Sequence, residues 1–300
     1  MLSFLKKRAA VPGQCGICVS GRTLTLSRVV QNAEGSKALV VCEHAEDVFE
    51  DTLEQRLSLW CQQHGLAGAS CVWVLSPEDY TLLLIEKPNV PDADLSNAAK
   101  WLIKDLISHP VEDAAIAAFS MPLQTSVKMM YVSVARISYL QKQLALMQRA
   151  GLVVTCITIA ELAIFNALTL QANAMTNIGL LYCGPDFMQL MMYNAKEFCV
   201  SRKLKVAKAH IAPGSSFEQG IENLTLEIQR SLDYFERQYH HPAPLVLYLD
   251  SVIAEIALPL KNTLGFAVEP FNVAPYLDVS LVKNIQHNML AINGALEPGL

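Results

Sequence analysis

The order of strand-like and helix-like segments is the feature that most restricts how this chain can fold. Short apolar runs predict strands, and apolar residues that recur at steps of three and four predict helices. The first half opens with three predicted strands, at residues 16–19, 23–31 and 37–43. The second half repeats this opening, with predicted strands at residues 179–183, 188–193 and 197–204. Helices follow each triplet, so we expect an α/β protein in two halves.

The clearest single element is a helix over residues 224–239, L-T-L-E-I-Q-R-S-L-D-Y-F-E-R-Q-Y. Its apolar residues recur at helical spacing and therefore share one face. They are Ile221, Leu224, Ile228, Leu232, Phe235 and Tyr239. This pattern predicts a surface helix with one buried face.

The same criteria place the other elements. Further helices are predicted at residues 47–64, 94–107, 138–151, 161–171, 252–264 and 278–292. Further strands are predicted at residues 70–75, 80–86, 114–122, 128–135, 153–159, 245–249 and 266–268. Small and polar residues at 171–177 predict a hinge between the halves. Residues 1–14 form a basic leader that we expect to be flexible.

Composition restricts the class of function. Hydrophobic residues make up 52% of the chain and charged residues 17%, which indicates a substantial core rather than disorder. A net charge of −5 gives no support for nucleic-acid binding. No uncharged apolar run is long enough for a transmembrane helix, so we expect a cytoplasmic protein that reaches a membrane only through partners.

The cysteines predict neither a disulfide framework nor a metal site. There are eight, scattered through the chain. Cys15 and Cys18 form a single C-x-x-C pattern, but residues three apart on a strand point to opposite faces. We therefore expect buried free thiols and no metal.

Several ordered motifs resemble the PilM-type pilus-assembly family, and within it the MshI proteins of MSHA pili. The densest match is E-I-Q-R-S-L-D-Y-F-E-R-Q at residues 227–238. P-E-D-Y at 77–80, followed by L-L-L-I-E at 82–86, is similar to a second family motif. A-K-W-L-I-K-D-L at 99–106 is similar to a third. Their order and spacing extend the resemblance over nearly the whole chain.

The resemblance implies an actin-like fold of the FtsA and PilM type, with two lobes and an inserted small α+β subdomain. The first half would cover residues 15–172, with the insert at about 76–135, and the second half residues 173–300. The family binds the short cytoplasmic tail of a PilN-type bitopic inner-membrane protein in a groove between core and insert. Leu82, Leu84 and Trp101 are the candidates in this sequence to line that groove.

Members of this fold hold ATP between two hairpin loops, whose glycines let backbone N–H groups approach phosphate and whose aspartates serve Mg²⁺. The first loop, of the family form G-I-D-I-G-S, corresponds to residues 16–21. Gly16 and Gly21 are present, but Cys18 stands in place of the aspartate and Ser20 replaces a glycine. A neutral thiol is a poor substitute, because Mg²⁺ requires oxygen ligands.

The second loop and the adenosine-binding segment also depart from the family pattern. Tyr182 and Gly184 flank a cysteine where D-I-G is expected, and Asp186 lies nearby in a different register. Asp250 and Ser251 occupy the place of a glycine pair after the predicted strand 245–249. We therefore expect no ATP hydrolysis and no required cofactor, with ATP and Mg²⁺ as an open alternative.

The resulting hypothesis is a cytoplasmic scaffold of an MSHA-type type IV pilus platform, held at the inner membrane by a PilN-like partner and by other platform proteins. It would be a pseudo-ATPase rather than an enzyme. One alternative is an ATP-binding assembly switch of the same machine, in which Asp186 does the magnesium work. The other is the cytoplasmic domain of a GspL-like type II secretion protein, which a transmembrane segment would normally follow.

Overall fold

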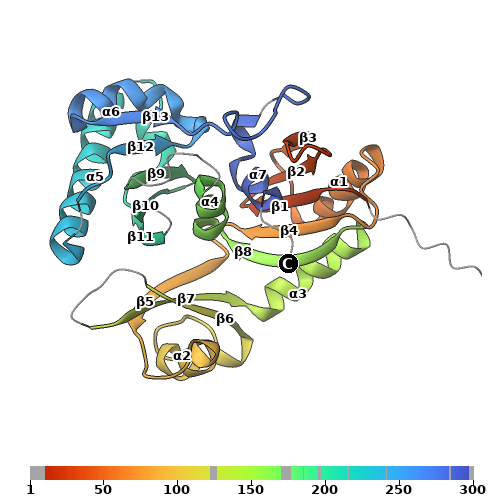
Figure 1. Ribbon diagram of the computed structural model, residues 1–300, viewed down its shortest axis with the longest axis horizontal. Helices are drawn as coiled ribbons and strands as arrows, with labels where there is room; N and C mark the ends of the chain where they lie inside the picture. The colour runs from red at the N-terminus through yellow and green to blue at the C-terminus, as the bar shows by residue number, and fades with distance from the viewer. Residues whose placement is uncertain are drawn as a thin grey trace, which may run out of the picture. The chain divides into compact units, whose positions relative to one another are not determined.

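The chain forms two compact units, each assembled from segments that are distant in the sequence (Figure 1). The computed structural model describes residues 11–121, 127–169, 177–184, 186–194, 197–214, 216–240, 242–283 and 285–296. The first unit comprises Met1–Val74, Leu140–Thr158 and Leu277–Leu300. The second comprises Leu75–Tyr139 and Ile159–Tyr276. Most of the predicted leader and residues 171–176 of the predicted hinge lie outside the described residues.

The first unit is built on a five-stranded sheet in the order β3-β2-β1-β4-β8. Its strands are β1 (Gln14–Ser20), β2 (Thr23–Gln31), β3 (Lys37–Ala45), β4 (Ser70–Leu75) and β8 (Val153–Ile159). The first three pair antiparallel as a meander. The helices of this unit are α1 (Glu50–Gln63), the larger part of α3 (Ile137–Arg149), and α7 (Met289–Ala295).

Alternating residues of β1 place α1 and α7 on opposite faces of this sheet. The Cys15 thiol lies close enough to Cys61 of α1 for the two to interact electrostatically. The next residue, Gly16, lies against the backbone of α7. Because successive residues of a strand point to opposite faces, the sheet is covered by a helix on each side. Its core is apolar and includes Cys15 and Cys18, which are buried and not joined in a disulfide.

The predicted C-terminal helix over residues 278–292 is wrong over most of its length. Asp278 forms an isolated parallel bridge with Ala38, and its backbone N–H and C=O bond the carbonyl of Lys37 and the amide of Leu39 at 2.9 and 2.8 Å. A short 3-10 helix, η5 (Ile285–His287), precedes α7. The first residue of the predicted helix, Asp278, pairs with β3 instead, and periodicity does not report such a long-range contact.

The second unit contains a five-stranded sheet in the order β11-β10-β9-β12-β13. Its strands are β9 (Ile178–Cys183), β10 (Met188–Asn194), β11 (Glu197–Leu204), β12 (Val246–Leu249) and β13 (Ala267–Pro270). The first three pair antiparallel, and β12 joins β9 and β13 in parallel. Its helices and 3-10 turns are α4 (Ala160–Thr169), η3 (Lys208–Ile211), α5 (Phe217–Tyr239), η4 (Ser251–Ile256) and α6 (Ala257–Leu264). The predicted helix 252–264 is thus divided into η4 and α6, and Ile253 within η4 departs from helical angles.

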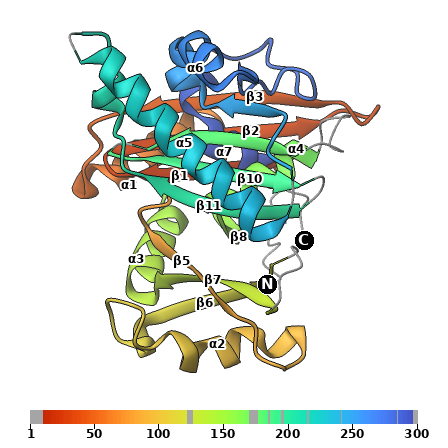
Figure 2. The same ribbon diagram turned by 90° about the vertical axis from the view of Figure 1, so that its left-hand side faces the viewer.

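The amphipathic helix predicted from spacing is confirmed. In α5, Ile221, Leu224, Ile228 and Phe235 are at most 5% exposed. They pack toward β11, η3 and α6, and Figure 2 shows α5 crossing in front of this sheet. Gly220 makes the approach of η3 possible, since a Cβ there would lie 1.8 Å from the carbonyl oxygen of His210.

A second, smaller sheet belongs to the same unit and contains the segment predicted as an insert. It is antiparallel in the order β5-β7-β6, and its strands are β5 (Tyr80–Glu86), β7 (Met129–Arg136) and β6 (Ala114–Ser120). Two 3-10 turns, η1 (Asp92–Asp94) and η2 (Val111–Asp113), flank α2 (Leu95–Ile103). Both views show α2 on one face of this sheet (Figures 1 and 2). Buried Leu95, Ala99 and Ile103 form its core with residues of β6 and β7.

The opposite face of the small sheet packs within the unit against β11. The hydroxyl of Tyr131 on β7 donates to the carbonyl oxygen of Cys199 on β11 at 2.6 Å. The rings of Tyr131 and Phe198 lie 5.0 Å apart, within the range in which aromatic pairs attract. These contacts join the predicted insert to the five-stranded sheet of the second unit. The insert therefore belongs to the second unit, although the sequence prediction placed it in the first half.

Within the described part of the chain, no helix is both long enough and apolar enough to cross a lipid bilayer. The 23-residue α5 has the length, but charged side chains occupy its exposed face.

Candidate functional site

A polar pocket lies in the second unit where β5 meets β10, β11 and the start of α4. Its volume is about 220 Å³, below the roughly 300–1,000 Å³ of sites for drug-sized ligands. Tyr80 and Leu82 of β5 form one wall, and Ser201 and Lys203 of β11 form another, with Glu161 also lining the pocket. The size suits one or two side chains of a peptide better than a nucleotide.

The pocket is lined by an acid that is completely buried. Glu161 is 0% exposed, and it accepts hydrogen bonds from the hydroxyl of Tyr80, from Ser201 Oγ at 2.9 Å and from Gln189 Nε2 at 2.7 Å. Burial raises the pKa of Glu161, and these donors lower it only in part. The carboxyl therefore keeps its proton to higher pH than an exposed glutamate does.

The backbone of Glu161 is held as well, because the Tyr193 hydroxyl donates to its carbonyl oxygen at 3.1 Å. Gln189 is 4% exposed, and its Oε1 is buried with no hydrogen-bond partner among the described residues. A buried acceptor without a donor costs free energy. A ligand that brings an N–H or O–H group to Gln189 Oε1 would remove that cost.

A cation stands at the edge of the pocket. Lys203 Nζ donates to the carbonyl oxygen of Pro77 at 3.0 Å and lies 4.5 Å from the centre of the Phe187 ring. The Lys203 residue is otherwise exposed. The pocket thus offers a buried carboxyl group, an amide, hydroxyls and one positive charge. This set suits recognition of polar peptide groups.

The structure brings together only two of the three residues predicted for a partner groove. Leu82 is half-buried and lines the pocket, and Leu84 is 36% exposed on the same face of β5. Leu83 and Ile85, the alternate residues, pack toward α2 on the other face. Trp101 lies on α2 and is 75% exposed. It is therefore separated from Leu82 and Leu84 by the sheet and lines no common groove with them.

The residues predicted for the first nucleotide loop lie in the first unit. Gly16 and Cys18 are inside β1, where Cys18 is 3% exposed and its carbonyl accepts from Thr25 Oγ1 at 3.3 Å. Ser20 ends β1 opposite Thr23, and Gly21 has a φ of +56° in the turn between them. Of these residues, only Ser20 and Gly21 lie at the hairpin tip.

The residues predicted for the second loop and the adenosine segment lie in the second unit, close to one another. Tyr182 is 7% exposed at the end of β9, and the N–H of Gly184 donates to the carbonyl of Phe187 across the turn at 2.9 Å. Asp186 is exposed in this turn. Ser251 begins η4 and donates through Oγ to the carbonyl of Phe271 at 3.1 Å.

Asp250 links these two segments. It is 3% exposed, and its carboxylate oxygens accept from the backbone N–H groups of Cys183 at 3.3 Å and Val252 at 3.4 Å. Burial raises the pKa of Asp250 to about 7, although the backbone donors and Lys208 lower it. Its carboxyl group thus links the end of β9 to the start of η4 through hydrogen bonds. Its position in the loop motif did not predict this structural role.

Sequence reasoning missed the residues that build the pocket, namely Tyr80, Glu161, Gln189, Ser201 and Lys203. One signal was present. Glu161 is a single charged residue inside the apolar run I-A-E-L-A at 159–163, and a buried charge needs partners. Nothing local indicates that those partners lie on β5, β10 and β11.

Comparison with known proteins identifies the fold. No protein family model and no curated protein matches the chain. Its structure is similar to one described as a PilM–PilN type IV pilus biogenesis complex, with a TM-score of 0.75 and 20% identity over 97% of this chain and 100% of that one.

Two further solved structures share the architecture. One is the cytoplasmic domain of EpsL, an inner membrane component of the type II secretion system of Vibrio cholerae, with a TM-score of 0.53 and 12% identity over 95% of each chain. The other is a Bacteroides thetaiotaomicron protein with an actin-like ATPase fold, with a TM-score of 0.54 and 8% identity over 97% of this chain and 99% of that one. The predicted actin-like α/β fold is therefore confirmed.

Proposed function

We propose that this protein is a PilM-like scaffold of a type IV pilus assembly platform, of the MSHA kind, on the cytoplasmic side of the inner membrane. It would capture the short cytoplasmic tail of a PilN-like membrane protein and connect it to other platform proteins. The likeness to a PilM–PilN complex over 97% of the chain supports this function. The observation that carries it in this chain is the pocket between β5 and β11.

The pocket has the properties that capture of a tail requires. It lies beside β5, an edge strand of the small sheet, and an edge strand can pair with an extended peptide. Leu82 supplies an apolar wall, and Gln189 Oε1 offers a buried acceptor. In this arrangement the peptide backbone would run along β5 while one polar side chain enters the pocket.

A direct test is fluorescence anisotropy with a labelled synthetic peptide of the PilN-like tail encoded by the same organism. Leu82→Arg should weaken binding more than about tenfold, because it places a long charged side chain in the pocket wall. Trp101→Ala serves as the control and should bind as the unchanged protein does. Absence of binding by the unchanged protein, or loss of binding in Trp101→Ala alone, would contradict the proposal.

We also propose that the protein does not hydrolyse ATP. By the resemblance, Cys18 and Tyr182 stand where the family loops carry aspartates, and the Asp250 carboxylate is occupied by backbone N–H groups. This leaves Asp186 as the exposed carboxylate in the β9–β10 turn. Calorimetric titration with Mg²⁺-ATP should give no binding heat and no rise in melting temperature. Micromolar binding would favour the assembly-switch alternative, and Asp186→Asn would then be the variant to compare.

The similarity to the EpsL cytoplasmic domain favours a second candidate, a GspL-like role in type II secretion. The same anisotropy assay separates the two. A pilus scaffold should prefer the PilN-like tail, whereas a secretion component should prefer the partners of the secretion platform.

A further inference from the structure

Two histidines and a glutamate meet in the first unit, and none of them belongs to the residues discussed above for partner or nucleotide. His44 lies near the end of β3, Glu46 follows it by two residues, and His287 is the last residue of η5. One potential ligand atom from each lies within 4.8 Å of the others. The two imidazole rings are 4.5 Å apart, centre to centre, with 31° between their planes. His44 Nε2 is 3.4 Å from Glu46 Oε1.

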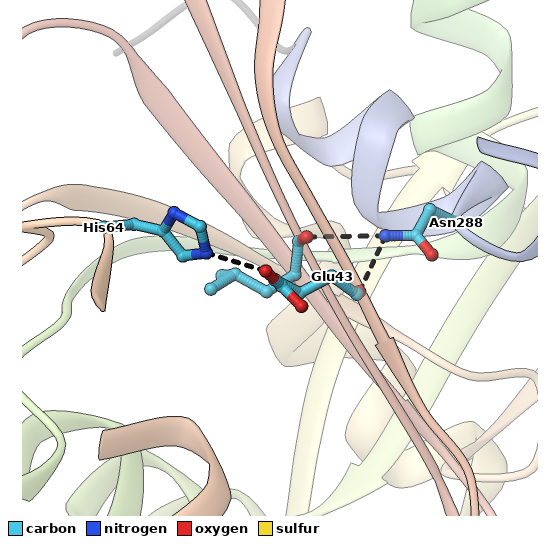
Figure 3. A network of polar contacts seen from close by, with 4 residues as sticks. Glu43, His64 and Asn288 are labelled. Atoms are coloured by element: carbon cyan, nitrogen blue, oxygen red, sulfur yellow. Dashed lines mark hydrogen bonds and ion pairs between the residues drawn. The ribbon is translucent and has the colours of Figure 1, made fainter. Parts of the chain in front are cut away.

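Side-chain hydrogen bonds beside the cluster join the two segments that carry the histidines. Asn288, the neighbour of His287, is 0% exposed, and its Nδ2 donates to the carbonyl oxygens of Glu43 at 2.8 Å and Leu26 at 3.4 Å (Figure 3). Glu43 is in turn the neighbour of His44. His44 therefore follows Glu43 and His287 precedes Asn288, the two residues that this hydrogen bond joins. The bond holds β3 close to the segment before α7.

The Glu43 side chain is engaged elsewhere, so the cluster is limited to three groups. Its Oε1 lies 2.7 Å from His64 Nε2 (Figure 3). Neither nitrogen of the His44 ring makes a short hydrogen bond that would compete with a ligand. Nε2 makes only the long contact with Glu46, and Nδ1 is buried with no hydrogen-bond partner in the described ranges. The Glu46 side chain is 71% exposed and can rotate toward a ligand.

We propose that His44, Glu46 and His287 form a binding site for a divalent transition metal of the zinc class. Two imidazoles and one carboxylate are a ligand set that zinc accepts, with water in the fourth position. Calcium and magnesium are disfavoured because they require mostly oxygen ligands. At zinc–nitrogen distances of about 2.0–2.1 Å the ligand atoms must approach by roughly 1 Å, which small side-chain rotations provide. The metal would clamp β3 to the segment leading into α7.

The test is calorimetric titration of the 300-residue protein with Zn²⁺, in a buffer that contains a non-chelating phosphine reductant to keep the thiols reduced. One saturable site is expected, together with a rise in melting temperature in excess zinc. His44→Ala and His287→Ala should each weaken binding by more than about tenfold, and Glu46→Gln should weaken it less. His240→Asn removes an exposed histidine of the second unit and should leave the site unchanged; asparagine tolerates the left-handed backbone there (φ +53°).

Cobalt distinguishes this site from the thiols of the chain. A Co²⁺ spectrum with only weak d–d bands would support nitrogen and oxygen ligation. A strong thiolate-to-cobalt charge-transfer band would overturn the proposal, because it would place the metal on cysteines. Unchanged zinc affinity in the double variant His44→Ala, His287→Ala would overturn it as well, provided that the variant melts cooperatively. This proposal does not depend on the pilus function.

Discussion

The backbone of Gly16 in β1 lies directly against the backbone of Ala291 in α7. A Cβ on residue 16 would be 1.9 Å from the carbonyl oxygen of Ala291 and 2.5 Å from the amide nitrogen of Ala295. Gly294 makes the same approach from the helix, with its ideal Cβ position 2.6 Å from Val74 Cγ2. Gly16 resembles part of a phosphate loop, but packing against α7 alone requires a glycine at this position, whether or not a nucleotide binds.

We therefore expect Gly16→Ala to reduce the free energy of unfolding by about 3 kcal/mol or more, because α7 must move off the sheet. Urea denaturation followed by circular dichroism measures this change. Gly65→Asn is the matched control. Gly65 has a φ of +62° and no atoms within 4 Å of an ideal Cβ, and asparagine tolerates that conformation. Equal stability of Gly16→Ala and the unchanged protein would contradict the packing of α7 described here.

The hydroxyl of Tyr80 is expected to matter more for stability than its size suggests. Tyr80→Phe leaves one oxygen of buried Glu161 without its donor, at a cost of about 1–3 kcal/mol in the free energy of unfolding. Tyr248→Phe, at a half-buried position on β12, should change stability by less than about 0.5 kcal/mol. Similar effects of the two variants in the same denaturation experiment would show that the Tyr80–Glu161 bond contributes little.

Asp250 should make stability depend on pH. Its pKa in the folded protein, about 7, lies above the ordinary value of 3.8. The folded state therefore binds a proton that the unfolded chain releases between these values. The stabilising contribution is complete below about pH 4 and is lost as the pH rises through 7, by at most about 1.4 kcal/mol per pH unit.

This dependence can be isolated by comparing variants from pH 4 to pH 8. Asp250→Asn cannot lose a proton, so its stability relative to the unchanged protein should improve steadily as the pH rises. Ser251→Ala, a neighbouring change at a residue that does not titrate, should differ from the unchanged protein by a constant amount. A constant difference for Asp250→Asn too would mean that Asp250 is ionised throughout.

The thiols should be slow to react in the folded protein. Burial raises the pKa of Cys15, Cys183 and Cys199 to about 12 and that of Cys42 and Cys61 to about 11, so little thiolate is present near pH 8. Half-buried Cys156 is the expected fast site. Ellman's reagent should therefore titrate one thiol rapidly and all eight only after unfolding. Cys156→Ser should abolish the rapid phase; a persistent rapid phase would identify an opening elsewhere.

The strands and helices themselves were largely predictable because their signals are local. The predicted strand 23–31 coincides with β2, and the amphipathic pattern of residues 224–239 lies within α5. The prediction for 278–292 failed for the opposite reason, since Asp278 pairs with β3, which is distant in the sequence. The α/β class and the actin-like likeness follow from the order of elements and motifs, both of which are properties of the sequence.

The sequence by itself determined most of the strands and helices and which of their faces are apolar. It also carries the resemblance that places Cys18 and Tyr182 where the family loops have aspartates. Only the tertiary structure decided which of those residues meet. It separated Trp101 from Leu82 by a sheet, gathered Tyr80, Gln189 and Ser201 around Glu161, and placed His287 beside His44. The physical reason is that periodicity reports how a segment presents its side chains to solvent or core. The partners of a buried carboxyl or an imidazole come from chain segments up to hundreds of residues away, and packing alone brings them together.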